Sequence, residues 1–231
     1  GEEGVDAGGL TKEWFSVLSK AMLNPGYGLF IQCADKTTYQ PNPASHYTNE
    51  HLQYFRFIGR VISMAIYNEQ YLDCYFTRSF YKHILGVPIK YQDIESIDPD
   101  YYKNLKWMLD NNIDGVLDYT FTQEVDEFGT RTQVELKPDG KNIPVTNENK
   151  HEYVRLVTEL KMTTSIKSQL VAFLEGFFEI IPKDLISIFN EQELELLMNG
   201  LPEVDIEDLR NNTEYEGYSE TSAPVQWFWK T

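Results

Sequence analysis

The sequence predicts an α+β fold that is mostly helical, with one small β element in its middle. Apolar residues recur at spacings of three and four positions through most of the 231 residues, which is typical of helices that bury one face. Near residues 115–145 the pattern changes to alternation between turn-forming residues, which is typical of a β-hairpin. With 42% apolar residues, the chain has enough apolar side chains for one large core or two small ones.

The first third is predicted to contain three helices and a short strand at 27–33. Thr11 is expected to cap the first helix, which the Asn24-Pro25-Gly26 turn ends. The second helix begins at Thr48 or Asn49, and the third runs from Thr77 to Gly86. The predicted buried faces of the first two helices are Trp14, Val17, Leu18, Ala21 and Met22, and Leu52, Phe55, Ile58, Ile62, Ala65 and Ile66.

The middle third combines a helix with the hairpin. Asp98-Pro99 is a strong helix start, because a capping carboxylate precedes a proline in the first turn. Alternation over 117–121 predicts a strand, and 130–136 the returning strand. The turn between them contains Phe128 and Gly129.

The last third is predicted to be helical. Thr146 is expected to cap one helix, and a second helix carries a stripe from Ile166 to Ile181 that Pro182 stops. Asn190 and Glu193 have the spacing of a capping box, and Gly200 ends that helix. Residues 224–229 resemble the start of another amphipathic helix.

Charge and composition exclude several classes of function. A formal net charge of −16 argues against nucleic acid as a partner, because phosphate binding needs clustered Lys and Arg. No run of about 18 apolar residues occurs, so no membrane span is expected. The start lacks a basic patch before an apolar stretch, so no signal peptide is expected. These observations predict a cytoplasmic or nuclear protein without a membrane contact.

Motifs for catalysis or metal binding are absent from the sequence. There is no HExxH, GxSxG, P-loop or CxxC pattern, so neither a metal nor a cofactor is expected. Cys33 and Cys74 are predicted to be small buried hydrophobes. The spacing leaves open a dyad of Cys33 with His46 or of Cys74 with His83.

Ordered motifs along the chain resemble the N-terminal lobe of HECT-type ubiquitin ligases. They are GEEGVDAGGL at 1–10, HLQYFRFIGRVI at 51–62, CYFTRSFYKHILG at 74–86, NLKWMLDNNIDGVLDYTF at 104–121, LKPDGKNIPVTNENKHEYV at 136–154, QLVAFLEGFFEIIP at 169–182, ELELLMNGLPEVDIEDL at 193–209 and QWFWK at 226–230. FTRSFYKHILG and NTEYEGY at 212–218 are most similar to the very large ligases of the plant ubiquitin-protein-ligase and animal Mule type.

The resemblance implies a fold and a division of labour. It implies a large helical subdomain at 1–96 and 161–231, and at 97–160 a small subdomain with a β-hairpin that docks a ubiquitin-conjugating enzyme. In this family ubiquitin passes to a cysteine in a C-terminal lobe and then to a substrate lysine. That cysteine lies in a Thr-Cys-Phe context, which this sequence lacks. The C-terminal lobe is therefore expected to be absent from this chain, which alone should be inactive.

The resemblance also implies two sets of binding residues. The set that docks the conjugating enzyme is Tyr101, Leu105, Met108, Leu117, Tyr119 and Tyr153. The set that binds a second, non-covalent ubiquitin is Asn24, Tyr27 and Phe128.

The residues alone permit other interpretations. Without the resemblance, the apolar stripe of the docking set is better explained as the core of the small subdomain, because apolar stripes are most often core. Phe128 is equally explained as local packing over the hairpin. A non-catalytic helical scaffold and, with less support, a cysteine hydrolase stay open as alternative functions. Asn104 and Asn111 are more polar than in relatives, so the preferred conjugating enzyme is left open.

Overall fold

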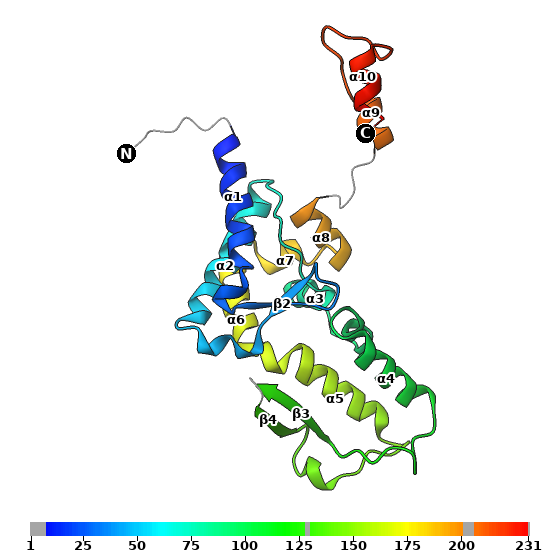
Figure 1. The fold of residues 1–231 in the computed structure, drawn as a ribbon. Coiled ribbons are helices and arrows are strands. Elements are labelled where there is room, and N and C mark those ends of the chain that lie inside the picture. The colour runs from blue at the N-terminus through cyan, green and yellow to red at the C-terminus, as the bar shows by residue number, and fades with distance from the viewer. Residues whose placement is uncertain (1–7, 128–129, 201–205, 231) are drawn as a thin grey trace. The chain divides into compact units, whose positions relative to one another are not determined.

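The computed structural model describes residues 8–127, 130–200 and 206–230. The chain divides into two compact units, Gly1–Gly200 and Leu201–Thr231. Among the described residues, the first unit is built from helices and two small antiparallel sheets (Figure 1). Its helices are α1 (Gly9–Met22), α2 (His51–Tyr67), α3 (Arg78–Leu85), α4 (Pro99–Asp110), α5 (Lys150–Met162), α6 (Lys167–Phe178), α7 (Lys183–Ile186) and α8 (Glu191–Asn199). The strands are β1 (Phe30–Gln32), β2 (Tyr39–Pro41), β3 (Thr122–Glu127) and β4 (Thr130–Glu135). The α+β class is therefore confirmed.

The larger core of the first unit is centred on the packing of α2 against α6. A Cβ atom at Gly59 would lie 2.0 Å from the carbonyl oxygen of Phe173, and one at Gly176 would lie 1.9 Å from that of Arg56. Each glycine therefore allows the opposite helix backbone to approach closely, which a larger residue would prevent. The large side chains that fill this core include Phe55, Ile62, Phe76, Phe80, Phe173 and Phe177.

A second, smaller core lies between α4, α5 and the segment before the β3–β4 hairpin (Figure 1). Its buried residues are Ile94, Leu105, Met108, Ile113, Phe121, Val145, Tyr153, Val154, Val157 and Met162. The hairpin pairs Thr122 with Glu135 and Glu127 with Thr130. We call these two groups of residues the large core and the small core; the subdomain boundaries at 96/97 and 160/161 stay predictions.

Several helix ends follow the predicted capping chemistry. The side chains of Thr77 and Asp98 accept hydrogen bonds from the backbone N–H groups of Phe80 and Tyr101. Asn190 forms a capping box with Glu193. Gly86 and Gly200 end their helices with positive φ values of 72° and 74°, a conformation that glycine adopts without strain.

The first helix differs from its prediction. α1 begins at Gly9, not at Thr11, and its buried side is formed by Phe15, Ser19 and Met22. Trp14 and Val17 are exposed. Because α1 has apolar residues on more than one side, the spacing alone did not determine which side faces the core.

Other helix boundaries shift by a few residues. α2 begins at His51, after Glu50 at a positive φ, and Leu52 is exposed. α5 begins at Lys150. Just before it, the Asn149 side chain accepts from the Thr146 N–H at 2.7 Å, and the Lys150 N–H donates to the Thr146 carbonyl at 2.9 Å. α6 ends at Phe178, before Pro182.

The predicted strand at 117–121 is wrong: β3 begins at Thr122. Residues 119–121 instead bond to the segment 140–145, which begins with the 3-10 helix Gly140–Asn142. The Val145 N–H donates to the Tyr119 carbonyl at 2.7 Å, and the Phe121 N–H donates to the Gly140 carbonyl at 3.0 Å. These bonds satisfy the backbone without a regular ladder, and only Thr120 makes an isolated bridge, to Pro144.

The second unit contains α9 (Ile206–Asn211) and α10 (Ala223–Phe228). The helix start predicted at 224 is confirmed. The indole N–H of Trp229 donates to the hydroxyl of Tyr215 at 2.8 Å. Across both units, no helix among the described residues is long and apolar enough to cross a bilayer.

Candidate functional site

A cavity of about 530 Å³ opens beside the small core. Its walls come from α4, from the segment 117–124, from β4 and from the first turns of α5. All six residues predicted to dock the conjugating enzyme line it: Tyr101, Leu105, Met108, Leu117, Tyr119 and Tyr153. The predicted residues of α4 and of the segment 117–124 therefore line one cavity. Leu117 and Tyr119 do so although they do not lie in a strand.

The floor of the cavity is also part of the small core. Leu105, Met108 and Tyr153 are exposed by only 2%, 3% and 5%. These three residues therefore pack the small core and also form the base of the cavity, and their role in docking stays a prediction. A charge placed on Met108 would be buried, so it would also destabilise the fold.

The mouth of the cavity is aromatic. Tyr119 and Trp107 are 48% and 45% exposed. The ring of Tyr119 stacks on that of Tyr153, with centroids 6.3 Å apart and planes 29° apart. Tyr153 in turn meets Phe121 edge-on at 5.7 Å. The exposed ring of Tyr119 therefore packs against the buried rings of Tyr153 and, through it, Phe121. This arrangement is suited to binding an apolar side chain of a partner.

One wall of the cavity is polar. The hydroxyl of Tyr101 donates to Gln123 Oε1 at 2.8 Å, and the Gln133 side-chain amide donates to the hydroxyl of Thr122 at 2.9 Å. Burial raises the pKa of Tyr101, and it raises the pKa of Tyr153 to about 12. Both phenols are therefore neutral at physiological pH, and the single hydroxyl proton of Tyr101 is the one donated to Gln123.

Several residues of the cavity were not predicted. Asn104 and Trp107 line it from α4, and the polar wall adds Asp118, Thr120, Thr122, Gln123, Glu124 and Gln133. Trp107 directly precedes Met108, and this exposed aromatic beside the stripe was a usable signal. The sequence had no such signal for the polar wall, because the position of these residues depends on how β4 pairs with β3. Asn111 ends α4, where its amide donates to the carbonyl of Trp107.

The predicted ubiquitin-binding residues are only partly described. The side chain of Asn24 accepts from the Gly26 N–H at 2.8 Å and so caps a short 3-10 helix, Pro25–Tyr27. Tyr27 is 54% exposed. Phe128 lies outside the described residues. The assignment of these three residues stays a prediction.

Both thiols are buried, as predicted. Burial raises the pKa of Cys33 and of Cys74, which makes both poor nucleophiles. The Nε2 atom of His83 lies 2.9 Å from the carbonyl oxygen of Met162 and so serves a backbone contact. These observations argue against a cysteine hydrolase. No cluster of three metal-ligating side chains occurs in the part of the chain that the structure describes.

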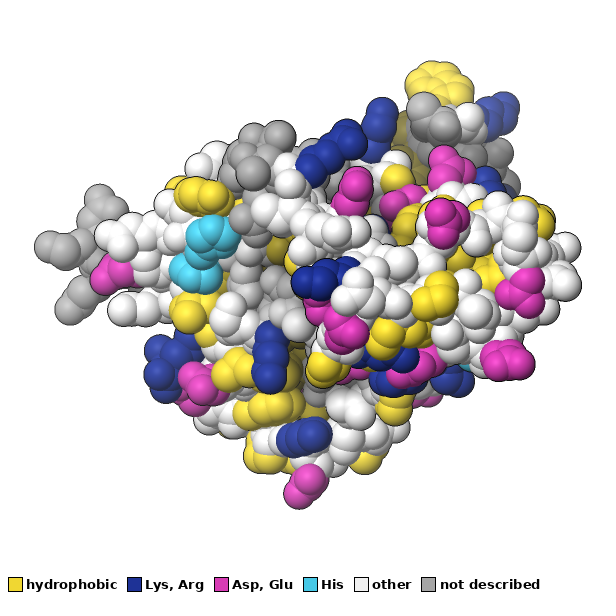
Figure 2. Space-filling view, turned by 90° about the horizontal axis from the view of Figure 1, so that it is seen from below, with side chains coloured by type: hydrophobic (Ala, Val, Ile, Leu, Met, Phe, Trp, Pro, Cys, Tyr) yellow, Lys and Arg dark blue, Asp and Glu magenta, His cyan; other side chains and the backbone are white. Residues whose placement is uncertain are grey.

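The surface seen from below carries groups of hydrophobic side chains interspersed with acidic and basic ones (Figure 2).

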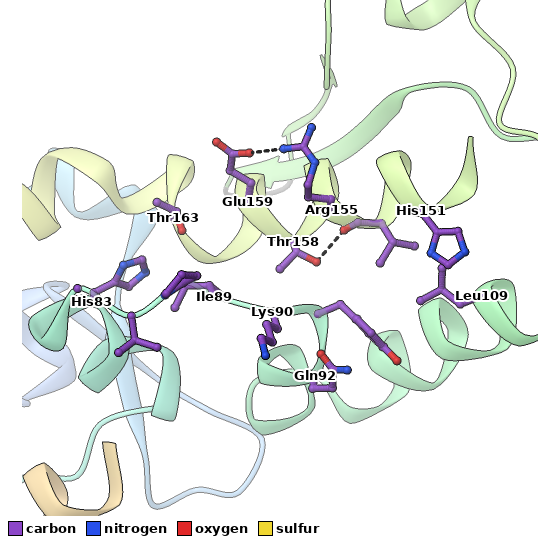
Figure 3. A pocket seen from close by; sticks show the side chains of 15 residues that line it. His83, Ile89, Lys90, Gln92, Leu109, His151, Arg155, Thr158, Glu159 and Thr163 are labelled. Atoms are coloured by element: carbon purple, nitrogen blue, oxygen red, sulfur yellow. Dashed lines mark hydrogen bonds and ion pairs between the residues drawn. The ribbon is translucent and has the colours of Figure 1, made fainter. Parts of the chain in front are cut away.

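A second cavity, of about 730 Å³, lies where the chain passes between the large and small cores. Figure 3 shows it ringed by Arg155 and Glu159 of α5, by Lys90 and Gln92, and by His83 at one end and His151 at the other.

Comparison with known proteins identifies the family. The family described as HECT-domain (ubiquitin-transferase) matches residues 16–231. A TOM1-like E3 ubiquitin-protein ligase of Neurospora crassa is 56% identical over the whole chain, which covers 6% of that protein. The E3 ubiquitin-protein ligases UPL1 of Arabidopsis thaliana and HUWE1 of Mus musculus are each 54% identical over the whole chain, which covers 6% and 5% of them. The chain thus spans a small part of these relatives, and it belongs to the HECT-domain family of ubiquitin transferases.

Proposed function

We propose that this chain is the part of a HECT ubiquitin ligase that docks a ubiquitin-conjugating enzyme charged with ubiquitin. Ubiquitin then passes to a cysteine of the ligase outside this chain and from there to a substrate lysine. The observation that carries the proposal is that the six residues implied by the family resemblance line one cavity. The names of the relatives, all E3 ubiquitin-protein ligases, support it.

The cavity has the chemistry of a docking slot for one apolar side chain. Its floor is apolar, its mouth carries two half-exposed aromatic rings, and its far wall offers hydroxyl and amide groups. A loop of the conjugating enzyme would insert an aromatic or aliphatic side chain, while its backbone bonds to the polar wall. Buried aromatic anchors of this kind supply most of the binding energy at small interfaces.

The contact is expected to be weak, because the partner must leave after each transfer. We expect a dissociation constant of roughly micromolar order. The acidic charge of the chain, −16 formally, would speed the approach of a basic partner surface and make the association rate fall with salt.

No thiol of the described chain is suited to carry ubiquitin. Cys33 and Cys74 are 7% and 1% exposed, and a thioester with a folded protein needs an accessible sulfur. The role of the chain is therefore to bring the charged enzyme to its place, and the covalent step belongs to another part of the ligase.

The proposal is tested by titrating the chain with a panel of conjugating enzymes, followed by NMR shift mapping. Saturable binding to one or more members, with shifts at Trp107, Tyr119 and Gln123, is expected. A folded chain that binds no member of the panel would contradict the proposal and favour the non-catalytic scaffold.

A further inference from the structure

The chain passes between the large and small cores at two places, and the end of α3 contacts both. The first passage is 86–93, which leads from α3 to the 3-10 helix Tyr91–Ser96. The second is 162–166, which leads from α5 to α6. α3 itself packs in the large core through Phe80, Ile84 and Leu85.

Lys82 of α3 forms an ion pair with the first passage, at Asp93. Its Nζ atom lies 2.7 Å from Asp93 Oδ1, and the two side chains are only 12% and 4% exposed. The other oxygen of Asp93 accepts from the backbone N–H of Lys90 at 2.8 Å. Glu191 of α8 lies 4.0 Å from the same Nζ atom. A nearly buried ion pair thus ties α3 to the residue that precedes Ile94 of the small core.

His83, the next residue, forms a hydrogen bond with the second passage, at Met162. Its Nε2 atom lies 2.9 Å from the carbonyl oxygen of Met162, the last residue of α5 and a member of the small core. The carbonyl only accepts, so the ring must be in the tautomer that carries hydrogen on Nε2.

A cavity also lies beside these two contacts. The cavity of about 730 Å³ lies between the first passage and α5, and His83 and Thr163 mark one end of it (Figure 3). The two polar contacts of α3 therefore bridge the large and small cores beside this cavity.

We propose that Lys82 and His83 are positioning residues that fix the orientation of the small core relative to the large core. Because the small core carries the docking cavity, they set where a docked conjugating enzyme presents its ubiquitin. This step rests on the proposed function; the restraint on the angle does not. Neither residue lines the docking cavity, so their loss should impair transfer and leave docking intact.

The variants are chosen as matched pairs. Lys82→Met and His83→Leu remove each contact, whereas Lys82→Arg keeps the charge and His83→Gln keeps a donor near the Nε2 position. Lys82→Gln with Asp93→Asn removes both buried charges together, because a single removal leaves an unpaired buried charge and can unfold the chain. Ile62→Val, inside the large core, controls for lost stability alone.

The first measurement is the distance between spin labels on Val171 of α6 and Lys106 of α4, both exposed. The unaltered chain should give one narrow distribution. His83→Leu and the Lys82→Gln/Asp93→Asn variant should broaden or shift it, and His83→Gln and Ile62→Val should not. Unchanged narrow distributions in the folded variants would overturn the proposal, whether or not any conjugating enzyme binds.

The second measurement uses the full ligase that contains this chain. Single-turnover transfer of ubiquitin from the charged conjugating enzyme should slow about tenfold or more in His83→Leu, since small misplacements of reacting groups cost up to about 100-fold. The affinity for the conjugating enzyme should change less than about twofold. Equal transfer rates in folded His83→Leu and unaltered ligase would also overturn the proposal. An unaltered ligase that binds no conjugating enzyme would instead contradict the proposed function.

Discussion

The exposed ring of Tyr119 stacks on the buried ring of Tyr153, with centroids 6.3 Å apart. One partner is 48% exposed and the other 5%. The pair therefore joins the mouth of the proposed docking cavity to the small core, and its two members differ in what their removal would do. Loss of Tyr119 removes a contact surface, whereas loss of Tyr153 also opens the core.

Truncation of Met108 should destabilise the chain. Met108 is 3% exposed in the small core, and Met→Ala at such a site costs about 2–5 kcal/mol, because it loses apolar contacts and leaves a void. Urea unfolding of Met108→Ala measures this cost. The matched surface change Tyr67→Ala, at a residue 74% exposed, should stay within about 0.5 kcal/mol. Equal stability of Met108→Ala and the unaltered chain would show that Met108 is not a core residue.

Gly176→Ala should also destabilise the chain, although alanine favours helices over glycine by about 1 kcal/mol. Its Cβ atom would lie 1.9 Å from the carbonyl oxygen of Arg56, so α2 and α6 must separate. The net loss is expected at about 1–3 kcal/mol. Gly9→Ala is the control, because its Cβ would meet nothing within 4 Å; it should be neutral or slightly stabilising. A gain in thermal stability for Gly176→Ala would contradict the described helix packing.

Neither thiol should react quickly in the folded chain. Burial raises the pKa of Cys33 and Cys74, so little thiolate exists near neutral pH, and access is blocked. Iodoacetamide at about pH 7.5, followed by mass spectrometry, should modify both only after addition of denaturant. Rapid alkylation of either thiol under native conditions would contradict this prediction and favour a cysteine hydrolase as the function.

Stability should fall as the pH is lowered below the ordinary pKa of histidine. Burial is the largest cause that lowers the pKa of His83, and the Met162 carbonyl and Asp93 only partly oppose it. The unfolded chain, with a histidine pKa of about 6.5, then binds more protons than the folded one. The stabilisation from neutral His83 is present above about pH 6.5 and is lost as the pH falls through the folded pKa.

Comparison with His83→Gln isolates this effect, because the other titrating groups are common to both chains. Free energies of unfolding at about pH 7.5 and 5.5 should decrease less in His83→Gln than in the unaltered chain. A parallel decrease would mean that His83 does not titrate in this range. His51 remains in both chains, and its pKa is also lowered, first by burial and then by the charge of His46.

Features with local causes were predicted from the sequence. The caps at Thr77, Asp98 and Asn190 and the glycine ends at Gly86 and Gly200 depend on a few neighbouring residues, so their residue types were sufficient. Burial of Leu105 and Met108 followed from helical spacing. The proposal that the cavity they line docks a conjugating enzyme came from the family resemblance.

Features that depend on distant segments were not predicted. The buried side of α1 is formed by Phe15, Ser19 and Met22 because of what packs against it, and the sequence of α1 is apolar on other sides too. Residues 119–121 alternate like a strand, yet their backbone bonds go to the loop at 140–145. The polar wall of the cavity and the contacts of Lys82 and His83 likewise join residues far apart in the chain.

The docking claim is tested most directly by the affinity of Tyr119→Ala for a conjugating enzyme that binds the unaltered chain. Calorimetry should give a dissociation constant at least about tenfold weaker, a loss of about 1.4 kcal/mol, with unfolding stability retained. Trp107→Ala should act in the same direction, and Tyr67→Ala on α2 should bind as the unaltered chain does. Unchanged affinity in folded Tyr119→Ala and Trp107→Ala would contradict the assignment of this cavity as the docking site.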